Sequence, residues 1–179
     1  YNKTKMIAER VFLSYKNIID IKCLRPATVC GLSERLRLDV TVNKLTFDAF
    51  YKNKIFVDGG SQVRPNVNLK DIIRVADHFL FSKKKFKDNI YNMGFENYSI
   101  LKIAKKIQKK TGAKLMVNKS VDIRSYRQDS TRLIKTGFKP EYNVDNAIEE
   151  LIKYFKRNKK SKFGTQNFNL KKMKKLNVK

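Results

Sequence analysis

The chain has 179 residues, near the usual size of one domain, and its 41% hydrophobic and 11% aromatic content is enough to bury a core, which excludes an intrinsically disordered chain. The sequence contains no run of about 18 apolar residues, so we expect no membrane span. The net charge of +25, carried mostly by lysine, favours anionic ligands, whether nucleotide phosphates or polymers.

In chain order, residues 1–16 place apolar side chains at the three- and four-residue spacing of a helix with one buried face. Residues 18–26 are β-branched and apolar and end at a proline, which predicts a strand. A loop is expected over 27–38. A helix over 39–52 follows, with Asp39 as its candidate N-cap.

The rest of the chain continues this alternation. Strands are predicted over 54–60, 62–69, 89–94 and 113–118, and helices over 71–81, 99–110, 129–136 and 143–156. Asp71 is expected to cap the helix that follows it, and Ser99 the next one. Strands that alternate with helices predict an α/β layered architecture.

The cysteines, the single histidine and the basic tail are not expected to take part in catalysis or metal binding. Cys23 and Cys30 have no histidine cluster beside them, so we expect core side chains, no metal site, no disulfide and a cytoplasmic location. His78, the single histidine, is expected on the surface. Residues 156–179 carry ten lysines and arginines and no acid, and are expected to form a basic, disordered tail.

Tyr1 and Lys5 stand one helical turn apart, so both side chains are expected on the same face of the first helix. A phenol has a pKa of about 10 and is a poor base at neutral pH. A neighbouring ammonium stabilises the phenolate and lowers that pKa, which lets a tyrosine exchange a proton with a sugar hydroxyl. The same spacing also occurs on solvated helix faces, so the pair alone does not distinguish a catalytic Tyr/Lys pair from two exposed side chains.

Five ordered blocks of sequence include and follow this pair. They are YNKTKMIAERVFLSY, IKCLRPATVCG, GGSQVRPNVNLKDIIRVADHFL, IYNMGFENYSILKIAKKI and DIRSYRQDSTRLIKTGFKPEYNVDNAIEELIKYF. Together they resemble the extended short-chain dehydrogenases/reductases, the NAD-dependent epimerase/dehydratase family, from the catalytic tyrosine to the carboxyl terminus. The resemblance spans about residues 1–155.

The resemblance implies a fold in two regions. Residues 1–31 match the end of a Rossmann-type NAD-binding domain, and 32–155 match mainly the smaller α/β substrate-binding domain, with some segments returning to the Rossmann sheet. Tyr1 is then the catalytic acid/base, and Lys5 tunes it and holds the nicotinamide ribose. The implied cofactor-binding residues are Lys5, Arg25, Pro26 and Thr28.

The implied substrate-binding residues are Asn43, Arg64, Asn92 and Arg124. The two arginines match those that grip the substrate diphosphate, because a planar guanidinium bonds phosphate oxygens in pairs. Other roles stay open. Arg64 could simply be a charged residue of an edge strand, and Asn92 could shape a turn. Arg127 could bind the diphosphate in place of Arg124.

The implied function is NAD- or NADP-dependent epimerisation, dehydration or reduction of a nucleoside-diphosphate sugar by a homodimer. The glycine-rich turn that receives the cofactor pyrophosphate, and the Ser/Thr that assists the tyrosine, should precede the catalytic tyrosine. They do not occur in these 179 residues, so the chain alone is expected to be inactive.

Two alternatives stay open. One is a basic module for anions or RNA, suggested by the charge and by Phe163 and Phe168 between lysines of the tail. No nucleic-acid motif accompanies them, so nucleic acid is not the expected partner. The other is a non-catalytic homologue that only binds nucleotide sugar.

Overall fold

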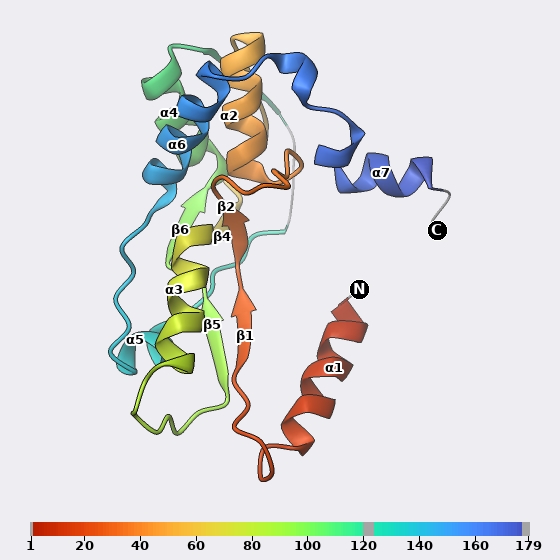
Figure 1. Cartoon of the computed structure of the whole chain (residues 1–179). Coiled ribbons are helices and arrows are strands. Elements are labelled where there is room, and N and C mark those ends of the chain that lie inside the picture. The colour runs from red at the N-terminus through yellow and green to blue at the C-terminus, as the bar shows by residue number, and fades with distance from the viewer. Residues whose placement is uncertain (1, 120–123, 177–179) are drawn as a thin grey trace.

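The computed structural model describes residues 2–119 and 124–176, and it has the predicted α/β architecture (Figure 1). Its elements in chain order are α1 (Asn2–Ser14), β1 (Cys23–Pro26), β2 (Thr28–Cys30), α2 (Thr41–Lys52), β3 (Lys54–Asp58), β4 (Val63–Asn68), α3 (Leu69–Leu80), β5 (Ile90–Met93), β6 (Glu96–Ser99), α4 (Ile100–Thr111), β7 (Lys114–Asn118), α5 (Thr131–Lys135), α6 (Val144–Lys156), 3-10 turns at Lys160–Lys162 and Thr165–Asn167, and α7 (Asn169–Lys175).

The described strands form three small sheets. β1 pairs with β5 in parallel, with Cys23 opposite Ile90. β4 lies between β2, which is parallel to it, and β6, which is antiparallel. β3 and β7 pair in parallel over five residues each. The β1–β5 pairing therefore brings a segment from the middle of the chain back beside residues 1–31.

The main core lies where α2 and α4 pack on β3 and α6 packs on both helices. Val42, Ile55, Ile103 and Ile148 each have no exposed surface there. Figure 1 shows these three helices gathered at one end of the molecule. Their apolar stripes, read from the sequence, are the surfaces they bury against each other.

Two strands and two caps differ from the prediction. β2 lies inside the expected loop over 27–38, and β6 precedes the helix capped by Ser99. Each directly adjoins another element, β1 or α4, and therefore has no boundary of its own in the sequence. Asp39 does not cap α2: its N-cap is Val40, without a side-chain bond. Asp71 does not cap α3 either, because the helix begins at Leu69 and is capped by Asn68.

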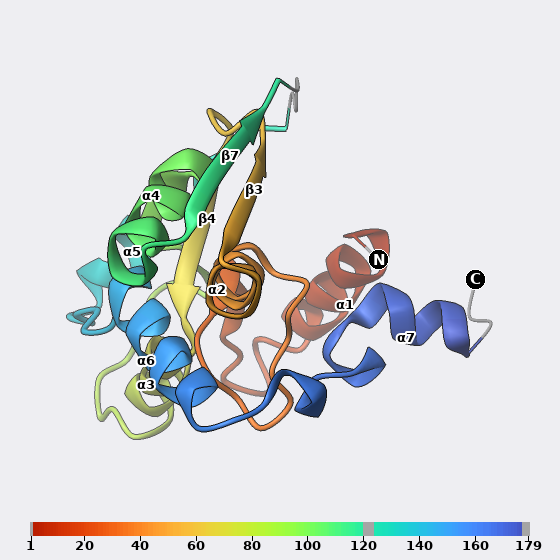
Figure 2. The same ribbon diagram turned by 90° about the horizontal axis from the view of Figure 1, so that it is seen from above.

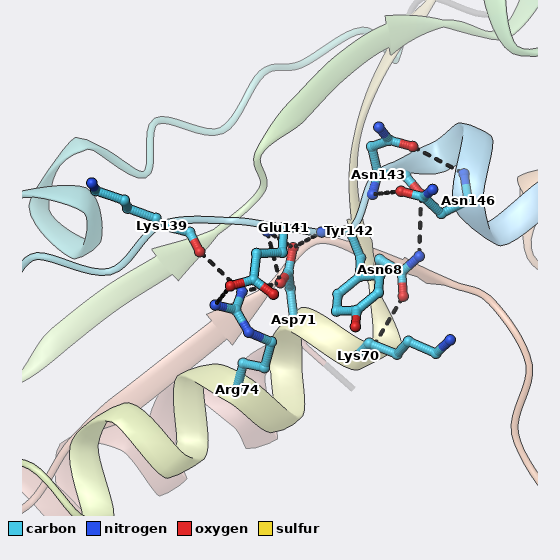
Figure 3. Close-up of polar contacts among 9 residues, drawn as sticks. All are labelled: Asn68, Lys70, Asp71, Arg74, Lys139, Glu141, Tyr142, Asn143 and Asn146. Atoms are coloured by element: carbon cyan, nitrogen blue, oxygen red, sulfur yellow. Dashed lines mark hydrogen bonds and ion pairs between the residues drawn. The ribbon is translucent and has the colours of Figure 1, made fainter.

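Asp71 instead fastens α3 to the segment before α6 (Figure 3). Its fully buried carboxylate accepts hydrogen bonds from the backbone N–H groups of Glu141 and Tyr142, at 3.2 and 3.0 Å, and from Arg74 Nη1 at 2.8 Å. Arg74 also donates to Lys139 O at 2.9 Å. A buried charge needs this many partners to offset its lost hydration.

The amino-terminal helix forms as predicted, but its apolar face is not buried by the described residues. Ile7, Val11 and Phe12 are 56%, 53% and 60% exposed. The helix is held to β1 by Arg25, whose Nε donates to Glu9 Oε2 at 2.8 Å. That hydrogen bond lowers the pKa of Glu9 below its ordinary value, against the opposing effect of burial.

The expectation of a disordered tail is corrected over the described residues of 156–179. Phe163 and Phe168 pack against the aromatic cluster of α2 and α6 that contains Phe47 and Phe155. Figure 2 shows α7 on the opposite side of the strands from α4 and α6. Because both phenylalanines pack on this cluster, their position between lysines no longer favours an RNA-binding tail.

Candidate functional site

Tyr1 lies outside the described residues. Its predicted partner, Lys5, lies on α1 and lines a cavity of about 720 Å³ between that helix and β1, together with Glu9, Cys23 and Arg25. The next residue after Tyr1, Asn2, lines a different cavity, described below. The start of α1 therefore lies between two hollows of the surface.

The second hollow, which we call the Thr28 cavity, has a volume of about 790 Å³. Pro26 and Thr28, from the end of β1 and the start of β2, line one part of it, and Asn43 from α2 lines another. Three predicted site residues from two segments therefore share one cavity. Its full lining is Asn2, Pro26, Ala27, Thr28, Val29, Gly31, Ser33, Arg35, Arg37, Val40, Asn43, Pro65, Leu69, Tyr126, Arg127 and Gln128.

Arg64 and Arg124 also come together, 60 residues apart in sequence. Both line a third cavity of about 570 Å³, the Arg64 cavity. Arg64 Nη1 donates to Arg124 O and, at 3.0 Å, to Val63 O. Its guanidinium lies over the ring of Tyr126, 5.3 Å from the centroid, and Tyr126 in turn lines the Thr28 cavity. One aromatic ring therefore links the two cavities.

The side-chain amides of Asn43 and Asn92 donate hydrogen bonds to backbone carbonyl groups. Asn43 is 3% exposed, and its Nδ2 donates to Gly31 O and Arg37 O at 3.2 and 3.0 Å, which fixes the loop between β2 and α2. Asn92 Nδ2 donates to Asp129 O at 3.0 Å. Asn92 therefore anchors the segment that leads to α5, and it does not line the three cavities.

Arg25 is held both through its side chain and through its backbone carbonyl. Its side chain pairs with Glu9, and its carbonyl accepts a hydrogen bond from Gln128 Nε2 at 3.0 Å. Gln128 packs so close to Gly94 that a Cβ there would lie 2.9 Å from Gln128 Cβ, an atom that cannot move without the backbone. A glycine at position 94 is therefore required for the segment of Gln128 to reach β1.

Sequence reasoning missed two cationic residues of the Thr28 cavity, Arg35 and Arg37, and considered a third, Arg127, only in place of Arg124. Arg35 and Arg37 lie in the SERLRLD segment, where the alternation of basic and apolar residues is the signal that was available. The structure buries the intervening Leu36 and Leu38 and leaves both arginines exposed.

Cys30 is buried as expected, and burial raises the pKa of its thiol to about 12, so it is a core side chain and no nucleophile. Cys23 is only half-buried. Over residues 2–119 and 124–176, no group of three or more His, Cys, Asp or Glu side chains has the arrangement of a metal site. Within the same ranges, none of the helices is both long and apolar enough to span a bilayer.

No family model matches the sequence. Among solved structures, the chain is similar to UDP-N-acetylglucosamine 4-epimerase from Bacillus cereus, with 23% identity, 89% of this chain and 54% of that chain covered, and a TM-score of 0.74. It is also similar to UDP-glucuronic acid 4-epimerase from Bacillus cereus in complex with UDP-glucuronic acid and NAD, with 25% identity, 83% and 50% covered, and a TM-score of 0.67.

A third similar structure is dTDP-glucose 4,6-dehydratase from Bacillus anthracis in complex with NAD, with 16% identity, 85% and 50% of the two chains covered, and a TM-score of 0.67. The chain spans about half the length of these proteins. Over that half, the chain has the fold of the NAD-dependent nucleotide-sugar epimerases and dehydratases, as its resemblance to extended short-chain dehydrogenases predicted.

Proposed function

We propose that this chain carries the acid/base pair and the sugar-nucleotide site of an NAD- or NADP-dependent enzyme that modifies a nucleoside-diphosphate sugar. The observation that supports this most is the meeting of Arg64 and Arg124 at one cavity, joined through Tyr126 to a second cavity that contains Thr28. A diphosphate bound by the two guanidinium groups would place its sugar toward Thr28.

The first chemical step is the removal of a sugar hydroxyl proton by Tyr1, whose phenolate is stabilised by Lys5. Asn2 follows Tyr1 directly and lines the Thr28 cavity, which supports this assignment. Bound NAD or NADP supplies the hydride acceptor. Pro26 and Thr28 suit its nicotinamide end, because they lie beside Asn2 in the same cavity. Reversal of this step on the other face of the sugar gives epimerisation, or dehydration where water is lost first. In a net reduction Tyr1 would instead donate its proton to the carbonyl oxygen, while the carbonyl carbon takes hydride from the reduced cofactor.

The exposed apolar face of α1 supports a homodimer, since Ile7, Val11 and Phe12 together form a surface that a second copy would cover. We propose a cytoplasmic enzyme in which residues 1–31 complete the cofactor domain and 32–155 bind mainly the sugar nucleotide. By itself the chain would be inactive, because it contains no glycine-rich loop for the cofactor pyrophosphate.

The acid/base assignment is tested by Tyr1→Phe in a polypeptide that contains this chain and turns over nucleotide sugar. We expect kcat to fall by about 10²–10⁴, with sugar-nucleotide affinity nearly unchanged. Turnover that survives the change would show that Tyr1 is not the acid/base.

The diphosphate assignment is tested on the chain itself by calorimetric titration with UDP and dTDP. Arg64→Ala should weaken the affinity about ten- to a hundredfold, since a charge-assisted hydrogen bond contributes about 1.5–3 kcal/mol. Arg132→Ala, an exposed arginine on α5 outside the three cavities, is the matched control and should change nothing. Equal effects of both variants would mean that Arg64 acts only through net charge.

A further inference from the structure

The Thr28 cavity has a strongly cationic wall that a diphosphate at Arg64 does not use. Arg35 and Arg37 approach it from the loop after β2, and Arg127 from the segment before α5. Among the described residues that line this cavity, none is a carboxylate. The cavity therefore has its own capacity to bind an anion.

The three arginines are not equivalent. Arg37 Nε donates to Asp39 Oδ1 at 2.9 Å, so a carboxylate already neutralises it. Arg35 Nη2 donates to the neutral Oδ1 of Asn169 at 2.7 Å. No described carboxylate pairs with Arg35 or Arg127. These two side chains can therefore offer a full charge to a ligand.

The loop that carries Arg35 is fixed by the far end of the chain. Leu38 N donates to Asn167 O at 2.8 Å, and Asn167 Nδ2 donates to Leu36 O at 2.8 Å. Asn169 N donates to Asp39 Oδ2 at 2.9 Å. Burial opposes ionisation of Asp39, but the hydrogen bonds from Arg37 and from the Asn169 backbone outweigh it and hold its pKa below the ordinary value.

These contacts place Asn169 in a defined position beside Arg35. Its backbone is fixed by Asp39, and its side chain accepts from the Arg35 guanidinium. A guanidinium restrained in this way loses less conformational freedom when it binds a ligand. The segment of Asn167 and Asn169 thus supports the loop that carries Arg35, although it does not itself line the cavity.

We propose that Arg35 and Arg127 bind an acidic group on the sugar, and that Asn169 is a positioning residue for Arg35. The inference rests on the proposed function, which places the diphosphate at Arg64 and the reacting sugar beside Thr28. The acidic group is a carboxylate, as in a uronic acid, because the proposed function already assigns the phosphates to Arg64 and Arg124, and a guanidinium binds a carboxylate through two parallel hydrogen bonds as it does a phosphate. The substrate class is then a nucleoside-diphosphate uronic acid.

The test compares the affinities of the chain for UDP-glucuronate, UDP-glucose and UDP by calorimetric titration. UDP-glucuronate should bind at least about tenfold more tightly than UDP-glucose, which is the effect of one charge-assisted hydrogen bond. Arg35→Ala should abolish this preference and leave UDP-glucose and UDP unchanged. Arg132→Ala should preserve it.

The outcomes separate the two proposals. If UDP and UDP-glucose bind but UDP-glucuronate shows no preference, the acidic-sugar inference is wrong and the proposed function stands. If Arg35→Ala weakens UDP as much as UDP-glucuronate, Arg35 binds a phosphate of the nucleotide and the inference is again wrong. If none of the three ligands binds, both proposals fail together.

The positioning role is tested by Asn169→Ala, which removes the bond to Arg35 and keeps the backbone bond to Asp39. The preference for UDP-glucuronate should fall by about three- to tenfold, while UDP affinity and the melting temperature stay at wild-type values. An unchanged preference would overturn the role of Asn169. Asn169→Gln, which retains the carboxamide, should restore part of the preference.

Discussion

The amino-terminal helix and the helical end of the molecule use the same sequence pattern with opposite results. In α1, the apolar residues Val11 and Phe12 are 53% and 60% exposed. In α2, α4 and α6, residues at the same spacing, such as Val42, Ile103 and Ile148, have no exposed surface. Helical periodicity therefore predicts that a helix forms and which face is apolar, but not which part of a protein covers that face.

The polar contacts of the two regions differ in the same way. Asp71 is fully buried and accepts hydrogen bonds from two backbone N–H groups and from Arg74. Glu9 and Arg25, which hold α1 against β1, are 20% and 50% exposed. Water can replace the second pair and cannot reach the first. The two regions should therefore respond very differently to matched substitutions.

The largest expected effect comes from Phe155→Ala in α6. Phe155 is 1% exposed and touches the rings of Phe47, Phe50, Tyr51 and Phe163. Its truncation should lower the free energy of unfolding by about 3–5 kcal/mol, measured by urea denaturation. The matched change Phe12→Ala in α1 should cost within about 0.5 kcal/mol at concentrations at which the chain is monomeric. Similar losses for the two variants under that condition would mean that Phe12 is buried within the single chain.

The intermediate effect is expected at the buried carboxylate. Asp71→Ala leaves the N–H groups of Glu141 and Tyr142 without their acceptor and removes one partner of the Arg74 guanidinium, which should cost about 2–4 kcal/mol of unfolding free energy. Asp71→Asn keeps an acceptor and should cost less. Asp77→Ala, an exposed position on the same helix, serves as the control and should be nearly neutral. A neutral Asp71→Ala would contradict the network in Figure 3.

The smallest effect is expected at Glu9→Gln, below about 1 kcal/mol, because the pair with Arg25 is partly exposed. The pKa of Glu9 is lowered in the folded state, so its contribution is present above its ordinary value of 4.5 and is lost as the pH falls through the folded value. The stability difference between wild type and variant should therefore vanish in acid. Glu34→Gln, at an exposed site in the following loop, should show no such pH dependence.

Much of the fold was predictable because long periodic segments specify their own secondary structure. The helices of α2, α4 and α6 and the strands β3 and β7 were identified from apolar spacing, and Gly112, which adopts φ +72°, ends α4. β2 and β6 were not identified, because each directly adjoins another element and is defined by its pairing with β4. The cap of α3 was assigned to Asp71 since the true cap, Asn68, lies inside the preceding strand.

The site was predictable only where the resemblance supplied a motif. Arg64 and Arg124 were named from sequence, and the structure brings them to one cavity. Arg35 was not singled out as a ligand-binding residue, and Arg127 was considered only as a substitute for Arg124, because nothing local marks a surface arginine as lining a cavity built from distant segments. The contact of Arg35 with Asn169 joins residues 134 positions apart, which no short-range pattern encodes.

The fastening of residues 35–39 by Asn167 and Asn169 has a consequence for biosynthesis. The loop emerges from the ribosome about 130 residues before the side chains that hold it, as the separation of Asp39 and Asn169 shows. Domains fold as they are synthesised, from the amino terminus onward. The loop over residues 35–39 is therefore fastened only after Asn167 and Asn169 have been synthesised, and a nascent chain that stalls before them carries a folded helical core with this arginine loop still unfastened.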